Sequence, residues 1–299
     1  MANTYNDRIM AVLALLPHGI SAAIGSRMTD VPIEEIRLRT ARPPQVITAK
    51  DEAIVPGAVF STQDAHELLE KLCRHSVYSM EDELKQGFLT LDGGTRVGVC
   101  GRPVVEDGRI IRLTKVTSFN IRITREVTGC AESILPYMTY QGRPVSTLIA
   151  APPAGGKTTL LRDIARCVSD GIGVLPCRTA IADERGELAG CVDGAPSFDV
   201  GARTDVMELA PKAEAMRMLI RSMSPEVIVT DELGGEDDAQ AAAEAAACGT
   251  VVIASVHASS GDELQSRSSL KKLIASGVFK RVLLVKRSGS LLRILPLGS

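Results

Sequence analysis

Hydrophobic and polar positions follow one pattern in the first half of the chain and a different one in the second half. Before about residue 140, two segments with helical spacing alternate with short strand-like runs that glycines interrupt. The predicted elements are helices over 9–25 and 63–74, strands over 36–39 and 44–47, and a hairpin joining 87–91 to 95–99 through the turn at 92–94. This mixture indicates an α+β unit.

From about residue 145, apolar strands alternate with helical segments of about 10–15 residues, which is typical of βαβ units. The predicted strands cover 145–150, 179–182, 227–230, 250–255, 281–286 and 291–295, and the helices cover 158–169, 211–223, 236–247 and 263–276. Glycines 171, 249 and 277 follow helix ends, where a left-handed residue is favoured. We therefore expect a parallel sheet with helices on both faces, and two domains, 1–140 and 141–299, joined near 137–144.

Composition limits the kinds of partner that are expected. The chain has 299 residues, 34 Lys and Arg against 36 Asp and Glu, no Trp, five Phe and four Tyr. A nucleic-acid-binding protein usually has a basic excess and aromatic side chains for base stacking, and this chain has neither. We therefore expect no nucleic-acid partner.

Two apolar stretches are candidates for a targeting or membrane segment. The run at 9–16 follows Asp7 and Arg8 and has no basic segment before it, so a signal peptide is not expected. The stretch 239–256 contains Gln240 and Glu244 and is divided by Gly249, which favours a helix followed by a strand. Seven cysteines without a CxxC pair or zinc-ligand spacing are expected to be reduced thiols of a cytoplasmic protein.

A candidate phosphate-binding loop directly follows the strand at 145–150 and opens the helix at 158–169. Its residues are Ala151, Pro152, Pro153, Ala154, Gly155, Gly156, Lys157 and Thr158, followed by Thr159, and all nine are predicted to bind the nucleotide. They match the P-loop pattern except that Ala151 replaces the first glycine. Backbone N–H groups would face phosphate oxygens, Lys157 would contact the β- and γ-phosphates, and the Thr158 hydroxyl would bind Mg²⁺. The alternative is an incidental glycine-rich turn.

A pair of acidic residues ends the buried strand at 227–230. P-loop enzymes need a carboxylate there to hold Mg²⁺ or its water, and a second one to orient the attacking water. Asp231 is predicted to hold Mg²⁺ or its water, and Glu232 is predicted to orient the attacking water. The alternative is an acidic strand end exposed to solvent.

Two further polar clusters follow strands of the same sheet, where open α/β folds bind ligands. Asp183, Glu184 and Arg185 come after the strand at 179–182, and His257 comes after the strand at 250–255. His257 is predicted to sense the γ-phosphate. The alternatives are a solvated turn for the acidic pair and a strand-capping role for the histidine.

The order of these motifs resembles that of the secretion-type traffic ATPases, a RecA-like branch of the P-loop enzymes. Asp183 and Glu184 would form the acidic box, 219–226 the approach to Walker B, and 255–258 the histidine box. The strings at 33–39, 87–90, 94–98, 120–123, 199–206 and 220–225 narrow the resemblance to the family of stage III sporulation protein AA. This similarity extends from about Ile33 to Lys286.

The resemblance implies a RecA-like α/β P-loop ATPase domain with a predominantly parallel sheet, preceded by a smaller α+β domain. It implies hydrolysis of ATP with Mg²⁺ and a hexameric ring in the mother cell. The ring would be cytoplasmic or peripheral to the membrane, and membrane proteins of a channel to the forespore would be its partners. By the same resemblance, Arg96 and Arg122 would reach nucleotide across a subunit boundary.

Several alternatives remain open at this point. The relatives in secretion systems tend to have Gly-Glu where this chain has Asp231 and Glu232, and Glu184 is a rival for the water-orienting role. Arg122 lies in an alternating strand pattern that a solvated or salt-bridged sheet face would also explain. Ala151 leaves room for a nucleotide-gated assembly scaffold with little turnover. A RecA-like helicase is disfavoured by the near-neutral charge.

Overall fold

The computed structural model describes residues 5–26, 31–73, 80–124, 126–152, 155–266, 271, 274–275, 277–286 and 291–295. The chain forms two compact units, Met1–Glu126 and Val127–Ser299. This division lies before the linker expected near 137–144. The reason is that Ala131, Ile134 and Met138 are buried in the core of the second unit.

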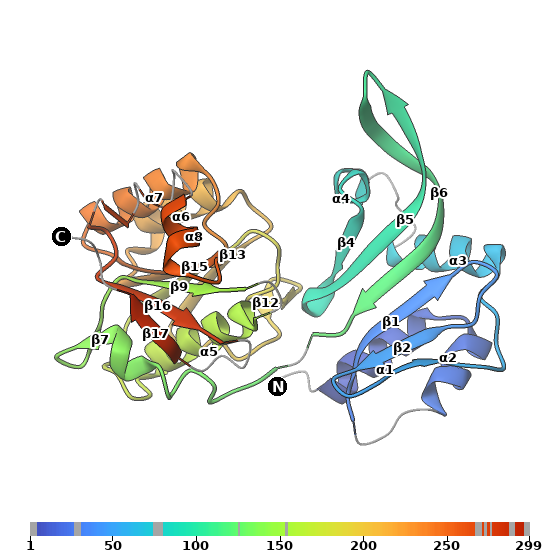
Figure 1. Cartoon of the computed structure of the whole chain (residues 1–299), viewed down its shortest axis with the longest axis horizontal. Coiled ribbons are helices and arrows are strands. Elements are labelled where there is room, and N and C mark those ends of the chain that lie inside the picture. The colour runs from blue at the N-terminus through green and yellow to red at the C-terminus, as the bar shows by residue number, and fades with distance from the viewer. Residues whose placement is uncertain are drawn as a thin grey trace. The chain divides into compact units, whose positions relative to one another are not determined.

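The first unit is built on a six-stranded antiparallel sheet in the order β3-β2-β1-β6-β5-β4 (Figure 1). Its strands are β1 (Ile33–Arg39), β2 (Gln45–Thr48), β3 (Glu52–Ile54), β4 (Phe88–Leu91), β5 (Thr95–Glu106) and β6 (Arg109–Arg122). Its helices are α1 (Tyr5–Leu15), α2 (His18–Gly25), α3 (Thr62–Leu72), α4 (Glu81–Lys85) and the short η2 (Asp92–Gly94). The predicted hairpin is confirmed as β4 and β5, and Gly93 adopts a φ of 79° in the turn.

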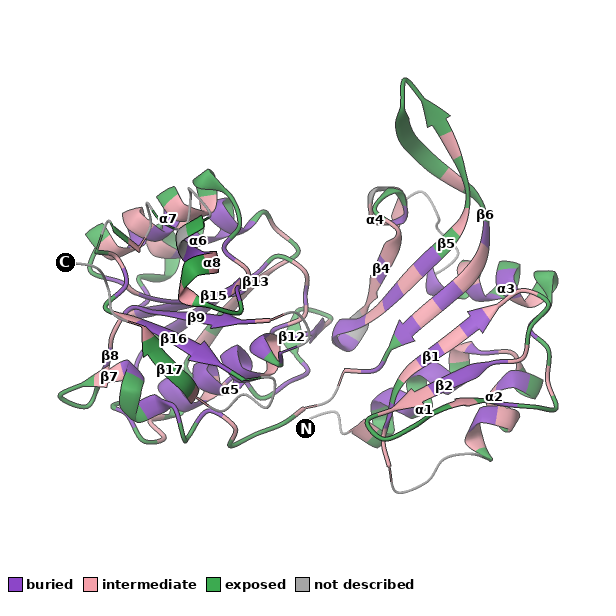
Figure 2. Cartoon of the chain, viewed as in Figure 1, coloured by how far each residue is buried: buried purple, intermediate pink, exposed green. Residues whose placement is uncertain are grey.

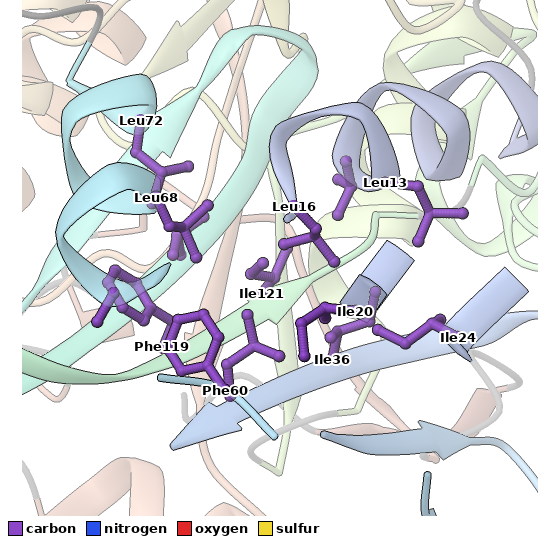
Figure 3. Close-up of a cluster of buried hydrophobic side chains, with 14 of the residues drawn as sticks. Leu13, Leu16, Ile20, Ile24, Ile36, Phe60, Leu68, Leu72, Phe119 and Ile121 are labelled. Atoms are coloured by element: carbon purple, nitrogen blue, oxygen red, sulfur yellow. The ribbon is translucent and has the colours of Figure 1, made fainter. Parts of the chain in front are cut away.

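Helices α1, α2 and α3 supply apolar side chains to one core with the sheet (Figure 3). Leu13, Ile20 and Leu68 from these helices gather with Ile36 and Ile121 from β1 and β6. The single helix expected over 9–25 is two helices. α1 ends at Leu15, and Pro17 precedes α2 with an extended ψ of 141°. A single helix does not run through Pro17, because a proline there would remove one backbone hydrogen bond and its ring would clash with the preceding turn.

The second unit contains a seven-stranded sheet in the order β13-β10-β14-β15-β9-β16-β17. Its strands are β9 (Thr147–Ala151), β10 (Thr179–Asp183), β13 (Thr204–Glu208), β14 (Val227–Thr230), β15 (Val251–His257), β16 (Arg281–Val285) and β17 (Leu291–Leu295). All neighbouring pairs are parallel except β16 and β17. The other elements are α5 (Lys157–Asp170), α6 (Lys212–Met223), α7 (Glu236–Ala247), α8 (Gly261–Ser266), η3 (Leu135–Met138), β7 (Thr139–Tyr140), β8 (Arg143–Pro144), β11 (Cys191–Val192) and β12 (Ala195–Pro196).

Successive residues of the central strands face opposite sides of this sheet, and both sides are covered. Ile149 and Ile253 pack in one cluster with the apolar face of α5, whereas Leu148 and Val252 pack in another with α6 and α7. Figure 2 accordingly shows the central strands as buried. The predicted α/β class, with a mostly parallel sheet between helices, is confirmed.

The described part of the second unit differs from the expected elements in a few places. β13 was not predicted, and β15 continues to His257, which is therefore the last strand residue. The helix expected over 263–276 is described only as α8, because much of the remainder of that range lies outside the described residues. The stretch 239–256 forms most of α7 and β15, as expected.

No helix among the described residues combines the length and the apolar character that a membrane crossing requires. All seven cysteines are free thiols.

Candidate nucleotide-binding site

The candidate site lies at the carboxyl ends of four adjacent parallel strands, β10, β14, β15 and β9. The carboxyl ends of parallel strands meet at one edge of the sheet, where α/β folds bind their ligands. The four strands end at Asp183, Thr230, His257 and Ala151. The topology thus brings together the motifs that the sequence places far apart.

The candidate phosphate-binding loop connects β9 to α5. Gly156 precedes the helix with a φ of 75°, a conformation that favours glycine. The Gly155 N–H donates to the Pro152 carbonyl at 3.1 Å, and a Cβ on Gly155 would lie 2.7 Å from that oxygen. Ala151 occupies an extended strand position opposite His257, so an alanine fits there without backbone strain. Pro153 and Ala154 lie outside the described residues.

Lys157, the first residue of α5, directs its ammonium group back toward the loop. The side chain is buried, with 6% of the residue exposed. Nζ donates to the carbonyl oxygens of Ala151 at 3.2 Å and Pro152 at 3.0 Å, and it lies 2.8 Å from His257 Nδ1. Burial lowers the pKa of Lys157, and the nearby carboxylates Glu232 and Asp231 oppose that change.

His257 joins Lys157 to Glu232. Because Nδ1 faces an ammonium donor, it must accept, so the ring proton belongs on Nε2. Nε2 lies 2.5 Å from Glu232 Oε1, and Arg185 Nη1 lies 3.0 Å from Glu232 Oε2. Burial alone would raise the pKa of Glu232, but Arg185 and His257 outweigh burial, and the net pKa is lowered. The result is an ionised carboxylate at the end of a continuous polar chain.

Asp231 and Lys212 form a second buried charge pair beside Glu232. Asp231 is 3% exposed, and burial raises its pKa to about 6, although Lys212 opposes that rise. Lys212 Nζ lies 3.8 Å from Asp231 Oδ1 and 3.4 Å from Glu184 Oε2. Carboxylate and hydroxyl oxygens are the ligands that Mg²⁺ prefers, so Asp231 and the half-buried Thr158 fit this ion.

Asp183 organises the segment that follows β10. Its carboxylate is fully buried and accepts hydrogen bonds from the N–H groups of Glu187, Leu188 and Ala189, each at 2.9 Å. Burial raises the pKa of Asp183 even though these bonds oppose the change. These hydrogen bonds fix the backbone of residues 187–189, in the loop that follows β10.

Arg162 of α5 holds the same loop by donating hydrogen bonds to two of the loop's backbone carbonyl groups. Its guanidinium donates to the carbonyls of Leu188 at 2.7 Å and Glu187 at 2.6 Å, and it stacks 3.6 Å from the centre of the Phe198 ring. The loop that presents Arg185 to the site is therefore attached to α5, the helix that begins with Lys157.

Arg96 and Arg122 lie opposite each other on β5 and β6 of the first unit. The Arg96 guanidinium lies 4.1 Å from the centre of the Phe88 ring, and Arg122 Nε lies 3.5 Å from Glu35 Oε1. The candidate phosphate-binding loop belongs to the second unit, so a role for these arginines at the nucleotide stays a prediction.

The sequence reasoning assigned no role to three residues of this site. Arg185 belongs to the polar cluster after the strand at 179–182, and Ser255 opens the histidine box at 255–258. Lys212 carries no signal beyond its place at the start of the predicted helix over 211–223. The Ser255 hydroxyl accepts from the Glu232 N–H at 3.1 Å. Contacts that join separate elements through long side chains leave no spacing pattern in a sequence.

The fold is similar to that of several solved structures. The structure resembles the ATPase DotB of Legionella pneumophila (TM-score 0.56, 16% identity, 85% of this chain and 72% of that one). It also resembles the pilus retraction motor PilT with bound ADP (TM-score 0.55, 14% identity, 87% of this chain and 76% of that one). The fold is therefore that of the RecA-like secretion and pilus ATPases.

Sequence similarity identifies the family within that class. The chain belongs to the family described as sporulation stage III, protein AA, whose model matches residues 6–296. It is 45% identical over 280 residues to the stage III sporulation protein AA of Bacillus subtilis (strain 168), covering 93% of this chain and 91% of the relative. The resemblance predicted from the motifs is confirmed.

Proposed function

We propose that this protein is a Mg²⁺-dependent ATP hydrolase that powers or assembles a secretion-like channel between mother cell and forespore. The observation that carries the proposal is the continuous chain of contacts from Lys157 through His257 to Glu232. It links the residue expected to bind phosphate to the residue expected to orient water.

Phosphate binding uses the loop and its lysine. The N-terminus of α5 and the turned backbone at Gly155 and Gly156 favour an anion. Lys157 Nζ makes its present contacts with two carbonyls and an imidazole, all neutral acceptors. Anionic phosphate oxygens are stronger acceptors for an ammonium group, so nucleotide binding draws Lys157 away from His257.

His257 then couples the presence of bound nucleotide to the orientation of the Glu232 carboxylate. When Lys157 leaves Nδ1, the imidazole loses one of the two contacts that fix its orientation. Glu232 is held through His257 on one oxygen and Arg185 on the other, so its direction depends on that change. This supports the phosphate-sensing role predicted for His257.

Glu232 orients the attacking water and accepts its proton. Its lowered pKa keeps it ionised for that purpose. The rival, Glu184, is the more exposed carboxylate and pairs with Lys212, which supports Glu232 for the role. Thr158 and Asp231 would hold Mg²⁺, which would supply positive charge to offset that of the phosphates.

The active form that we propose is an assembly of several copies of this chain. We infer a cytoplasmic, hexameric ring, peripheral to the membrane at most, that acts on membrane proteins of the channel. Arg96 and Arg122 reach the nucleotide of a neighbouring subunit, which makes hydrolysis depend on assembly. Family membership and the likeness to a pilus retraction motor support this reading.

Arg96→Ala and Arg122→Ala are expected to preserve ATP binding and to lower hydrolysis by about 10³-fold, because an arginine acts mainly on charge in the transition state. Binding is measured by calorimetry and hydrolysis by phosphate release. Arg112→Ala, an exposed arginine of the same strand β6, serves as control and should keep the wild-type rate. An equal loss of binding and hydrolysis in both variants would refute the role.

A further inference from the structure

We infer that Lys212 is a positioning residue of this site, which fixes the Glu232 peptide and serves as an internal counter-cation that a divalent metal must displace. The inference rests on the proposed function and adds a residue that lies in none of the motifs. The observation behind it is that the buried ammonium group of Lys212 contacts residues at the ends of β10 and β14.

Lys212 begins α6, and its side chain extends from that helix into the site. The residue is 4% exposed, and a buried lysine persists only where its charge is compensated. Nζ donates to the Glu232 carbonyl at 2.9 Å and lies near the Glu184 and Asp231 carboxylates. It therefore joins the residues that follow β10 to those that follow β14.

The first consequence concerns the backbone of Glu232. This residue has a φ of +39°, a left-handed conformation that non-glycine residues adopt only when their surroundings enforce it. Lys212 holds its carbonyl, the Ser255 hydroxyl holds its N–H, and the Leu233 N–H donates to the Ser255 carbonyl at 2.9 Å. Without Lys212, one of these restraints is lost, and the Glu232 carboxylate is less well aimed.

The positive charge of Lys212 also affects how strongly a divalent cation binds at the neighbouring carboxylates. The ammonium group lies 3.8 Å from the Asp231 carboxylate and 3.4 Å from that of Glu184, the acidic groups that a divalent cation would also seek. Lys212 and the cation therefore compete. Removing the lysine charge should strengthen metal binding while it weakens turnover, whereas loss of a purely structural lysine would weaken both.

The test measures Mn²⁺ binding to the full chain with ADP present, by the electron paramagnetic resonance signal of free Mn²⁺. Lys212→Met is expected to bind Mn²⁺ about tenfold more tightly, because a unit charge near the carboxylates is removed. Its ATP hydrolysis should fall at least about tenfold, because the carboxylate is misaligned. Lys280→Met removes an exposed lysine that donates to a carbonyl in the same unit, and should change neither value.

A second variant keeps the inference testable if Lys212→Met does not fold. Lys212→Gln is also neutral but retains an N–H donor, so it should show the tighter Mn²⁺ binding with a smaller loss of hydrolysis. Unchanged or weaker Mn²⁺ binding in the folded variants would overturn the inference while wild-type binding and hydrolysis still supported the proposed function. Wild-type protein that bound no Mn²⁺ with ADP and hydrolysed no ATP would overturn both.

Discussion

Glu232→Gln is expected to lower ATP hydrolysis by about 10³-fold and to leave ATP affinity within about threefold of wild type. The amide keeps the shape of the side chain but loses the negative charge that orients water and accepts its proton. Lys157 and the loop backbone, which bind phosphate in this account, are untouched. Phosphate release gives the rate, and calorimetry with a slowly hydrolysed ATP analogue gives the affinity.

Glu184→Gln is the matched control for this prediction. Glu184 lies one residue beyond β10 and pairs with Lys212, so its loss should cost about tenfold or less in rate. A larger loss in Glu184→Gln than in Glu232→Gln would assign the water-orienting role to Glu184 and contradict the account.

Lys157→Ala is expected to weaken ATP and ADP binding by about 10²-fold or more, because we propose that its ammonium group is the point charge for the β- and γ-phosphates. The free energy of unfolding, in contrast, should not fall in this variant as nucleotide affinity does. Burial lowers the pKa of Lys157, which means that the fold disfavours its charged form. The free energy of unfolding of the variant should therefore stay within about 1 kcal/mol of wild type, or rise.

Urea denaturation and calorimetric titration with ADP check the two halves of this prediction. Lys71→Ala removes an exposed lysine of α3 and should leave nucleotide binding unchanged. Wild-type ADP affinity in Lys157→Ala would show that the loop is an incidental glycine-rich turn.

The sequence predicted the second unit well because its elements carry strong local signals. The strand β14 is a short apolar run, and α7 ends just before Cys248 and Gly249, so both were predicted with the bounds observed. β13 was missed because Thr204, Asp205 and Glu208 give an edge strand a polar composition. The break at Pro17 was missed because helical spacing continues across it.

The sequence could predict members of the candidate site where a polar residue follows a strand or matches a known motif. Lys157 was predicted from the P-loop pattern, and Glu232 and His257 were predicted because they follow strands. The structure joins the three through hydrogen bonds. Lys212 could not be found in this way. Its ammonium group reaches the site through a long side chain from the start of α6, and only the folded topology shows what it meets.

The most direct test of the central claim is phosphate release from Mg²⁺·ATP by purified wild-type protein over a concentration series, with Lys157→Ala and Glu232→Gln measured beside it. For a ring-forming ATP hydrolase, we expect a rate per subunit that rises with protein concentration and falls to background in both variants. Wild-type protein that bound ATP but stayed at the variant background at every concentration would contradict it, and would indicate a nucleotide-gated scaffold in place of a hydrolase.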